Sequence, residues 1–178
     1  MKTLAIISLA IFVGFIVISV LRFGLQESYS AFSPKWDEKV PIHNMHLWSI
    51  ITFVVAFLLM IPMIDMGGGS PWQFLGFFAP LYLFTVAIFP LEDIKPDDTE
   101  KDIAEKKKKR TIHTVAAACC SVAAICWVIL VEHLWWVMLI CAALCAAAAY
   151  FTKTLKSSLV FWSEMAAFST VYSILIFA

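Results

Sequence analysis

The sequence has few charged residues and few glycines. Only 15% of its 178 residues are charged, whereas 62% are hydrophobic and the mean hydropathy is +0.88. Soluble domains contain about a quarter charged and about half apolar residues. The six glycines form no phosphate-binding pattern, because no lysine and helix start follow Gly67, Gly68 and Gly69. These absences exclude a soluble enzyme, a disordered regulator and a nucleotide site, and they leave an integral membrane protein.

An excess of positive charge is also missing. Basic and acidic residues both number 13, so the net charge is zero, whereas nucleic-acid binding needs basic residues that neutralise phosphates. The cysteines all lie in apolar runs and none lies in a loop, which argues against an extracellular disulfide framework. We therefore expect no nucleic-acid partner, no cofactor and no bound metal. The cysteines are Cys119, Cys120, Cys126, Cys141 and Cys145.

Long apolar runs take up most of the chain. A run of roughly 18 to 25 apolar residues is long enough to cross a bilayer as a helix. Such runs cover residues 3–21, 47–66, 72–91, 112–131, 134–151 and 158–178, and they leave no room for a separate soluble domain. We predict an all-α fold, in which residues 1–178 form a single domain, a bundle of six transmembrane helices.

The first run, residues 3–21, also resembles a signal peptide, because Lys2 precedes it. The run is about nineteen residues long, has no Ala-x-Ala cleavage site and continues into Arg22. We therefore interpret it as a membrane span that is retained.

The basic residues lie almost entirely in the connections after the first, third and fifth runs. These connections hold twelve of the thirteen Lys and Arg residues, and Lys2 is the exception. Basic connections tend to stay on the cytoplasmic side of a membrane. The count therefore predicts a multi-pass protein of the cell membrane with these three connections in the cytoplasm and both termini outside it. The usual preference for a cytoplasmic N-terminus is the alternative, but it would require the basic cluster described next to cross the membrane.

The charged segment between residues 92 and 111 predicts a cytoplasmic helix. Acidic residues follow Pro96, which favours a helix N-terminus. Asp102 with Lys106 and Glu105 with Lys109 are acid-before-base pairs four residues apart. We expect a helix from about residue 97 to residue 111 that continues into the fourth run. Its basic cluster either sets the topology alone or also binds anionic lipid headgroups. This cluster consists of Lys106, Lys107, Lys108, Lys109 and Arg110.

Glu164 is the clearest polar exception within an apolar run. An ionisable side chain is costly in hydrocarbon, so it is a candidate functional residue. If the sixth run begins near Leu159, Glu164 lies roughly 8 Å inside the cytoplasmic edge at a rise of about 1.5 Å per residue. Its own helical face is apolar, so a hydrogen-bond partner must come from another helix. Glu164 is then either a structural interhelical contact or a proton, ion or substrate site.

Three of the four histidines are expected near the same membrane face as Glu164. Pro41 suits the first turn of a helix, so His43 and His46 share a face at the start of the second run. His113 begins the fourth run. Three imidazoles beside a carboxylate are able to bind zinc and activate a water molecule. Alternatively, these histidines only satisfy hydrogen bonds at the interface, and the neighbouring basic cluster would repel a cation.

Small residues dominate the fourth and fifth runs, around Cys120 and Cys145. Small side chains allow membrane helices to pack closely. Because only Glu132 and His133 separate the two runs, we expect them to form an antiparallel hairpin with Cys120 level with Cys145.

Short motifs in the second half of the chain carry a resemblance. They are FTVAIFP at residues 84–90, IHTVAA at 112–117 and FWSEMAAF at 161–168. Over the third to sixth runs the chain resembles a group of uncharacterised small six-span membrane proteins of gut bacteria and their phages. The resemblance implies that His113 and Glu164 belong to a shared pattern, and it implies no activity.

Three classes of function remain open. The absence of catalytic motifs favours a non-enzymatic accessory, sensor or structural membrane component, whose partners are the lipid bilayer, including anionic lipids, and further copies or other subunits. A small proton- or ion-coupled transporter would use Glu164 and the helix kinks expected at Pro62 and Pro80. An intramembrane metal-dependent lipid hydrolase would use His43, His46, His113 and Glu164.

Overall fold

The computed structural model describes residues 1–37 and 46–178, and this part of the chain is helical. The all-α prediction is confirmed for these residues. A 3-10 turn, η1 (Tyr29–Ala31), precedes the second helix. The helices are α1 (Lys2–Phe23), α2 (Phe32–Asp37), α3 (Leu47–Met66), α4 (Phe74–Ile88), α5 (Glu100–Leu130), α6 (Trp135–Phe151) and α7 (Leu159–Phe177).

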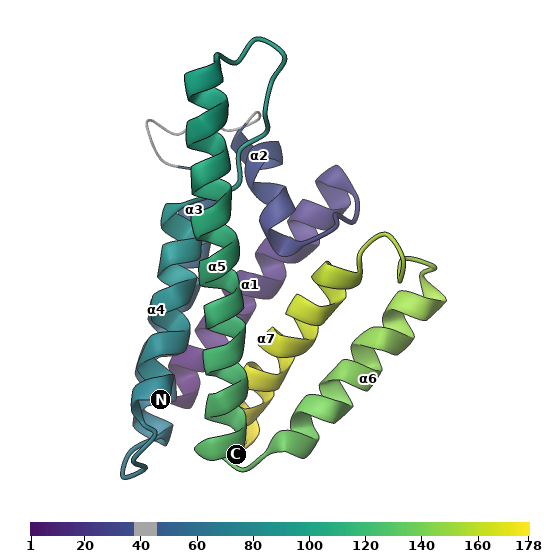
Figure 1. Ribbon diagram of the computed structural model, residues 1–178. Coiled ribbons are helices and arrows are strands. Elements are labelled where there is room, and N and C mark those ends of the chain that lie inside the picture. The colour runs from purple at the N-terminus through teal and green to yellow at the C-terminus, as the bar shows by residue number, and fades with distance from the viewer. Residues whose placement is uncertain (38–45) are drawn as a thin grey trace.

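The longer helices alternate in direction and lie side by side (Figure 1). α4 packs between α3 and α5, α1 packs on α3, and α7 contacts α1 and α5. α6 packs mainly on α7 and stands at the edge of the molecule. Both termini lie toward one end of the bundle, whereas α2 and the charged start of α5 lie toward the other (Figure 1).

Four helices, α1, α3, α5 and α7, are long and apolar enough to cross a membrane. α4 and α6 are also apolar, but they contain only 15 and 17 residues. At a rise of about 1.5 Å per residue both are shorter than the roughly 30 Å hydrocarbon core. α4 ends early because Pro90 follows Phe89, and a residue before proline disfavours the helical conformation. These helices are compatible with a membrane protein.

α5 joins the charged segment to the fourth apolar run, as predicted. Thr99 caps its N-terminus, because the Thr99 side chain accepts from the Asp102 backbone while the Asp102 carboxylate accepts from the Thr99 backbone. The helix begins at Glu100, slightly later than expected. The cause is a turn in which the Lys95 backbone N–H donates to the Asp98 carboxylate at 2.7 Å.

α3 and α4 lie in close contact at Gly76. A Cβ atom at this position would lie only 2.6 Å from the carbonyl oxygen of Met63. The same carbonyl accepts a hydrogen bond of 3.2 Å from Nε1 of Trp127 on α5. A side chain at residue 76 would therefore push apart the region where α3, α4 and α5 meet.

The sequence predicts a loop at residues 22–46, between the first two apolar runs, and the structure corrects this prediction. The described part of this connection after α1 folds back onto the bundle as η1 and α2, with Phe32 and Trp36 buried. Trp36 stacks on Phe15 and donates from Nε1 to Oγ of Ser19 at 2.9 Å. The connection therefore contributes side chains to the core, because its aromatic residues replace water contacts by contacts with α1 and α3.

A second correction concerns α5 and α6, which do not form the expected close hairpin. His133, at φ 55°, lies in the turn between them, and α6 leaves this turn away from α5 and packs on α7. Cys120 lines a cavity among α3, α4, α5 and α7, whereas Cys145 lines another cavity between α5, α6 and α7. The two thiols therefore face different spaces.

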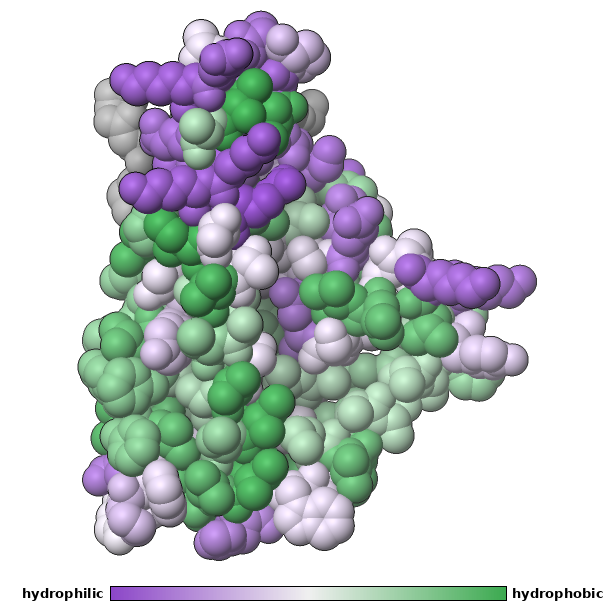
Figure 2. Space-filling view, viewed as in Figure 1, coloured by the Kyte–Doolittle hydropathy of each residue, from purple (hydrophilic) through white to green (hydrophobic). Residues whose placement is uncertain are grey.

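Large apolar side chains cover the sides of the bundle. In Figure 2 hydrophobic residues occupy the middle of the visible face, and hydrophilic residues gather over the start of α5 and the connection between α6 and α7. Exposed apolar residues occur on all six helices of 15 residues or more. An apolar belt of this kind is what a surrounding hydrocarbon phase would cover.

Candidate functional site

Glu164 on α7 is bound by the connection that follows α1. The backbone N–H of Tyr29 donates to Oε2 of Glu164 at 2.6 Å. The partner comes from another element, as expected, but it is a backbone amide of η1 and not a side chain. A carboxyl oxygen accepts from an amide in either protonation state, so this contact holds α7 against η1.

His113 on α5 is buried and makes two hydrogen bonds. Its Nδ1 lies 2.7 Å from the carbonyl oxygen of Phe89, and its Nε2 lies 2.9 Å from Oγ of Ser30. Because a carbonyl only accepts, Nδ1 carries a proton, and in the neutral ring Nε2 accepts from the Ser30 hydroxyl. The imidazole thus joins the end of α4 to η1, and both of its nitrogens are occupied.

Tyr29 contacts α7 and α3 through its backbone N–H, its carbonyl and its hydroxyl. Its N–H binds Glu164, its carbonyl accepts from Nε1 of Trp48 at 3.2 Å, and its hydroxyl lies 2.8 Å from Oγ1 of Thr52. The Thr52 hydroxyl donates to the Trp48 carbonyl at 2.8 Å, so Tyr29 donates to Thr52. Burial raises the pKa of the Tyr29 phenol well above its ordinary value, so the hydroxyl stays neutral and remains a donor.

A further contact ties the same connection to the N-terminus of α7. The carbonyl of Glu27 accepts from the N–H of Phe161 at 2.9 Å. The first N–H groups of a helix have no partner within the helix, so this contact caps α7. We call residues Glu27, Tyr29 and Ser30, with their respective partners Phe161, Glu164 and His113, the η1 clamp. Through it a short stretch of chain binds α5 and α7, and through Tyr29 it also binds α3.

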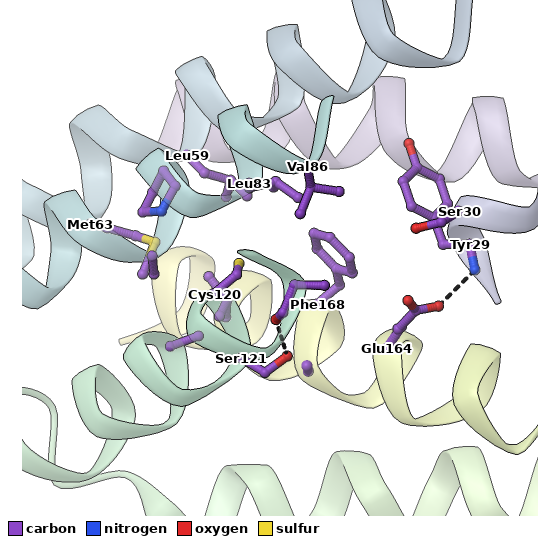
Figure 3. A pocket seen from close by; sticks show the side chains of 16 residues that line it. Tyr29, Ser30, Leu59, Met63, Leu83, Val86, Cys120, Ser121, Glu164 and Phe168 are labelled. Carbon is purple, nitrogen blue, oxygen red and sulfur yellow. Dashed lines mark hydrogen bonds between the residues drawn. The ribbon is translucent and has the colours of Figure 1, made fainter. Parts of the chain in front are cut away.

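A cavity of about 90 Å³ lies beside the η1 clamp. In Figure 3 Tyr29, Ser30 and Glu164 stand at one end of it and Met63 at the other. Most of the remaining lining is apolar and comes from α3, α4, α5 and α7. Glu164 therefore carries the one carboxyl group among the lining residues of this cavity, at the edge of an apolar space.

His46 does not join this cluster. His46 precedes α3 and lines a separate recess with Ser49, Glu92 and Lys109. The prediction for His43 falls outside the described residues. Within residues 1–37 and 46–178, no three His, Cys, Asp or Glu side chains lie close enough together to hold a metal ion.

The predicted headgroup cluster divides into paired and exposed residues. Lys106 contacts Asp98 at 2.6 Å, and Lys109 contacts Glu92 at 2.9 Å and Glu105 at 3.2 Å. The Glu105–Lys109 pair is as predicted, whereas Lys106 pairs with Asp98 and not with Asp102. The hydrogen bond from Lys106 lowers the pKa of Asp98 below its ordinary value. The exposed members are Lys107, Lys108 and Arg110.

Sequence reasoning missed Tyr29, Ser30, Trp48 and Thr52 as site residues. A signal was present, because Tyr29, Phe32 and Trp36 follow the three-and-four spacing of one helical face. Such a stripe of aromatic residues indicates a segment that packs on the bundle.

No family model, no curated protein and no solved structure matches this chain. The resemblance to small six-span membrane proteins therefore stays a prediction, and the site is interpreted from its own geometry.

Proposed function

We propose that this chain is a six-span protein of the cell membrane and a non-enzymatic accessory, sensor or structural component. In this proposal α4 and α6 also cross the bilayer. The shortfall in their length is met by local thinning of the bilayer and by the flanking aromatic residues. The connections after α1, α4 and α6 face the cytoplasm because they carry nearly all of the Lys and Arg residues.

The η1 clamp is the single observation that carries the proposed role. Glu164 and His113 are the polar groups most expected to do chemistry, and both are hydrogen-bonded to adjacent residues of one connection. Groups engaged in this way stabilise a particular packing of helices. A role in stabilising the helix packing therefore explains why both polar residues are present, and it requires no substrate.

Proton flux in proteoliposomes tests this role. We expect the purified protein to dissipate an imposed pH gradient no faster than empty liposomes do, and Glu164→Gln to leave this unchanged. Proton-dependent flux that the wild type supports and Glu164→Gln abolishes would contradict the proposal. Gln keeps an oxygen that accepts from Tyr29, so the variant separates proton transfer from the structural contact.

A small proton- or ion-coupled transporter is the second candidate. It is favoured by the cavity beside Glu164 and by Pro80, which lies inside α4 and lines the same cavity. A proline within a membrane helix leaves a backbone carbonyl without its usual partner and creates a hinge. The flux measurement distinguishes this candidate from the first.

A further inference from the structure

A larger cavity, of about 320 Å³, lies between α5, α6 and α7. It follows from the outward course of α6, which packs on α7 and leaves a wedge beside α5 (Figure 1). Figure 2 shows a recess between the body of the molecule and this outer arm. Val128 on α5, Met138 and Ala142 on α6, and Val171 on α7 are among its lining residues.

The lining of this wedge is almost entirely apolar, so a hydrocarbon chain suits it better than water does. Water molecules in such a space would find few hydrogen-bond partners. An empty space would instead deprive the lining atoms of their van der Waals contacts. In a bilayer the surrounding molecules that supply matching contacts are lipid acyl chains.

The end of the wedge that meets the connection between α6 and α7 is basic. Leu155 and Leu159 line this end, and Lys153 and Lys156 belong to the same connection and are exposed. Neither lysine is ion-paired within the part of the chain that the structure describes. No acidic residue occurs between positions 151 and 163. This contrasts with the start of α5, where carboxylates neutralise Lys106 and Lys109.

The connection is also held in place against α7. Nε1 of Trp162 donates to Oγ1 of Thr154 at 2.9 Å, and the N–H of Ser158 donates to the carbonyl of Thr154 at 2.9 Å. Thr154 lies between the two lysines in sequence. The basic groups are therefore carried on a segment that is bonded to the helix lining the wedge.

We propose that the wedge between α5, α6 and α7 binds one acyl chain of an anionic phospholipid, whose phosphate contacts Lys153 and Lys156. The apolar lining accommodates the chain, and the unpaired basic groups at one end select a negative headgroup. The inference rests on the proposed placement of the chain in a membrane. This site differs from the predicted headgroup binding by the basic cluster of α5, because it includes a cavity for an acyl chain as well as basic side chains for the headgroup.

Native mass spectrometry of the full chain released from detergent tests this site. The probes are phosphatidylglycerol and phosphatidylcholine with identical acyl chains. We expect the wild type to bind phosphatidylglycerol roughly thirtyfold more tightly, which is the order of preference that two basic residues supply. The double variant Lys153→Gln/Lys156→Gln should lose this preference, whereas the control Lys107→Gln/Lys108→Gln should retain it.

The cavity is tested separately from the charge. Ala142→Phe fills the wedge and should reduce the binding of both lipids, whereas Ala143→Phe, one residue further and outside the lining, should not. Equal binding of both lipids by the wild type overturns the inference, as does binding that Ala142→Phe leaves unchanged. A dimer that Ala142→Phe dissolves also overturns it, because a second copy would then occupy the wedge.

A separate measurement tests whether the protein is an integral membrane protein. A chain that leaves the membrane fraction in an alkaline carbonate wash contradicts the proposed function itself. A chain that remains there and binds both lipids equally contradicts only the lipid site.

Discussion

The backbone N–H of Tyr29 donates to the Glu164 carboxylate at 2.6 Å, although 135 positions separate the two residues in sequence. The next residue, Ser30, contacts His113 at 2.9 Å. Two adjacent residues of the connection after α1 therefore bind the polar groups of α5 and α7. This arrangement explains why a carboxyl and an imidazole lie within largely apolar helices, since each satisfies a partner that would otherwise be buried and unbonded.

Glu164→Ala should destabilise the protein, whereas Glu164→Gln should be much milder. Ala leaves the Tyr29 N–H without an acceptor, which costs about 1–3 kcal/mol for a buried group, and Gln restores an acceptor oxygen. Thermal unfolding in detergent, followed by circular dichroism, measures both variants. Equal unfolding midpoints for the two variants would contradict a structural role for the carboxyl.

His113 and Ser30 should show energetic coupling. His113→Ala and Ser30→Ala each remove one side of the 2.9 Å contact. The double variant should be less destabilised than the sum of the single variants by about 0.5–1.5 kcal/mol, the net value of a hydrogen bond. Chemical unfolding of all four proteins of the cycle provides the measurement. Strict additivity would show that the contact adds nothing to stability.

Gly76→Leu should disrupt the packing of α3 on α4. The new side chain would meet the Met63 carbonyl, and overpacking of this kind costs about 1–3 kcal/mol. Gly14→Leu on α1 is the matched control, because a Cβ at residue 14 meets no atom within 4 Å. The unfolding midpoints of the two variants are compared. The prediction fails if Gly76→Leu is tolerated as well as the control.

Asp98 should contribute a pH-dependent part of the stability at the start of α5. The hydrogen bond from Lys106 lowers the pKa of Asp98 in the folded protein. Its contribution is therefore present above the unfolded pKa of about 3.9 and is lost as the pH falls through the lower folded pKa. Asp98→Asn should be less stable than the wild type at neutral pH, and this difference should shrink in acid. A difference that grows in acid would show that the pKa moves in the opposite direction.

The helical content of this fold follows directly from local patterns. The apolar runs at residues 47–66 and 158–178 nearly coincide with α3 and α7, and the acidic residues after Pro96 mark the start of α5. Such features depend on neighbours along the chain, so a sequence reveals them. The end of α4 before Pro90 follows from local chemistry too, but hydropathy alone extends the run past it.

The η1 clamp and the course of α6 depend on contacts between distant residues. Nothing near Tyr29 in sequence shows that its N–H is bonded to Glu164. The small residues of α5 and α6 predict close packing, but they do not name the partner helix, and α6 packs on α7. Which helix α6 packs on depends on contacts throughout the bundle. The local pattern of small residues does not report these contacts, and it therefore predicted the wrong hairpin, of α6 with α5.

Labelling of single cysteines in intact cells tests the six-span arrangement most directly. In a chain whose five natural cysteines are replaced, Ser70→Cys lies between α3 and α4, and Ser157→Cys lies between α6 and α7. The account predicts that a membrane-impermeant maleimide labels the cysteine at residue 70 in intact cells and the cysteine at residue 157 only after permeabilisation. Labelling of both cysteines from the same side, or the reverse order, would contradict it.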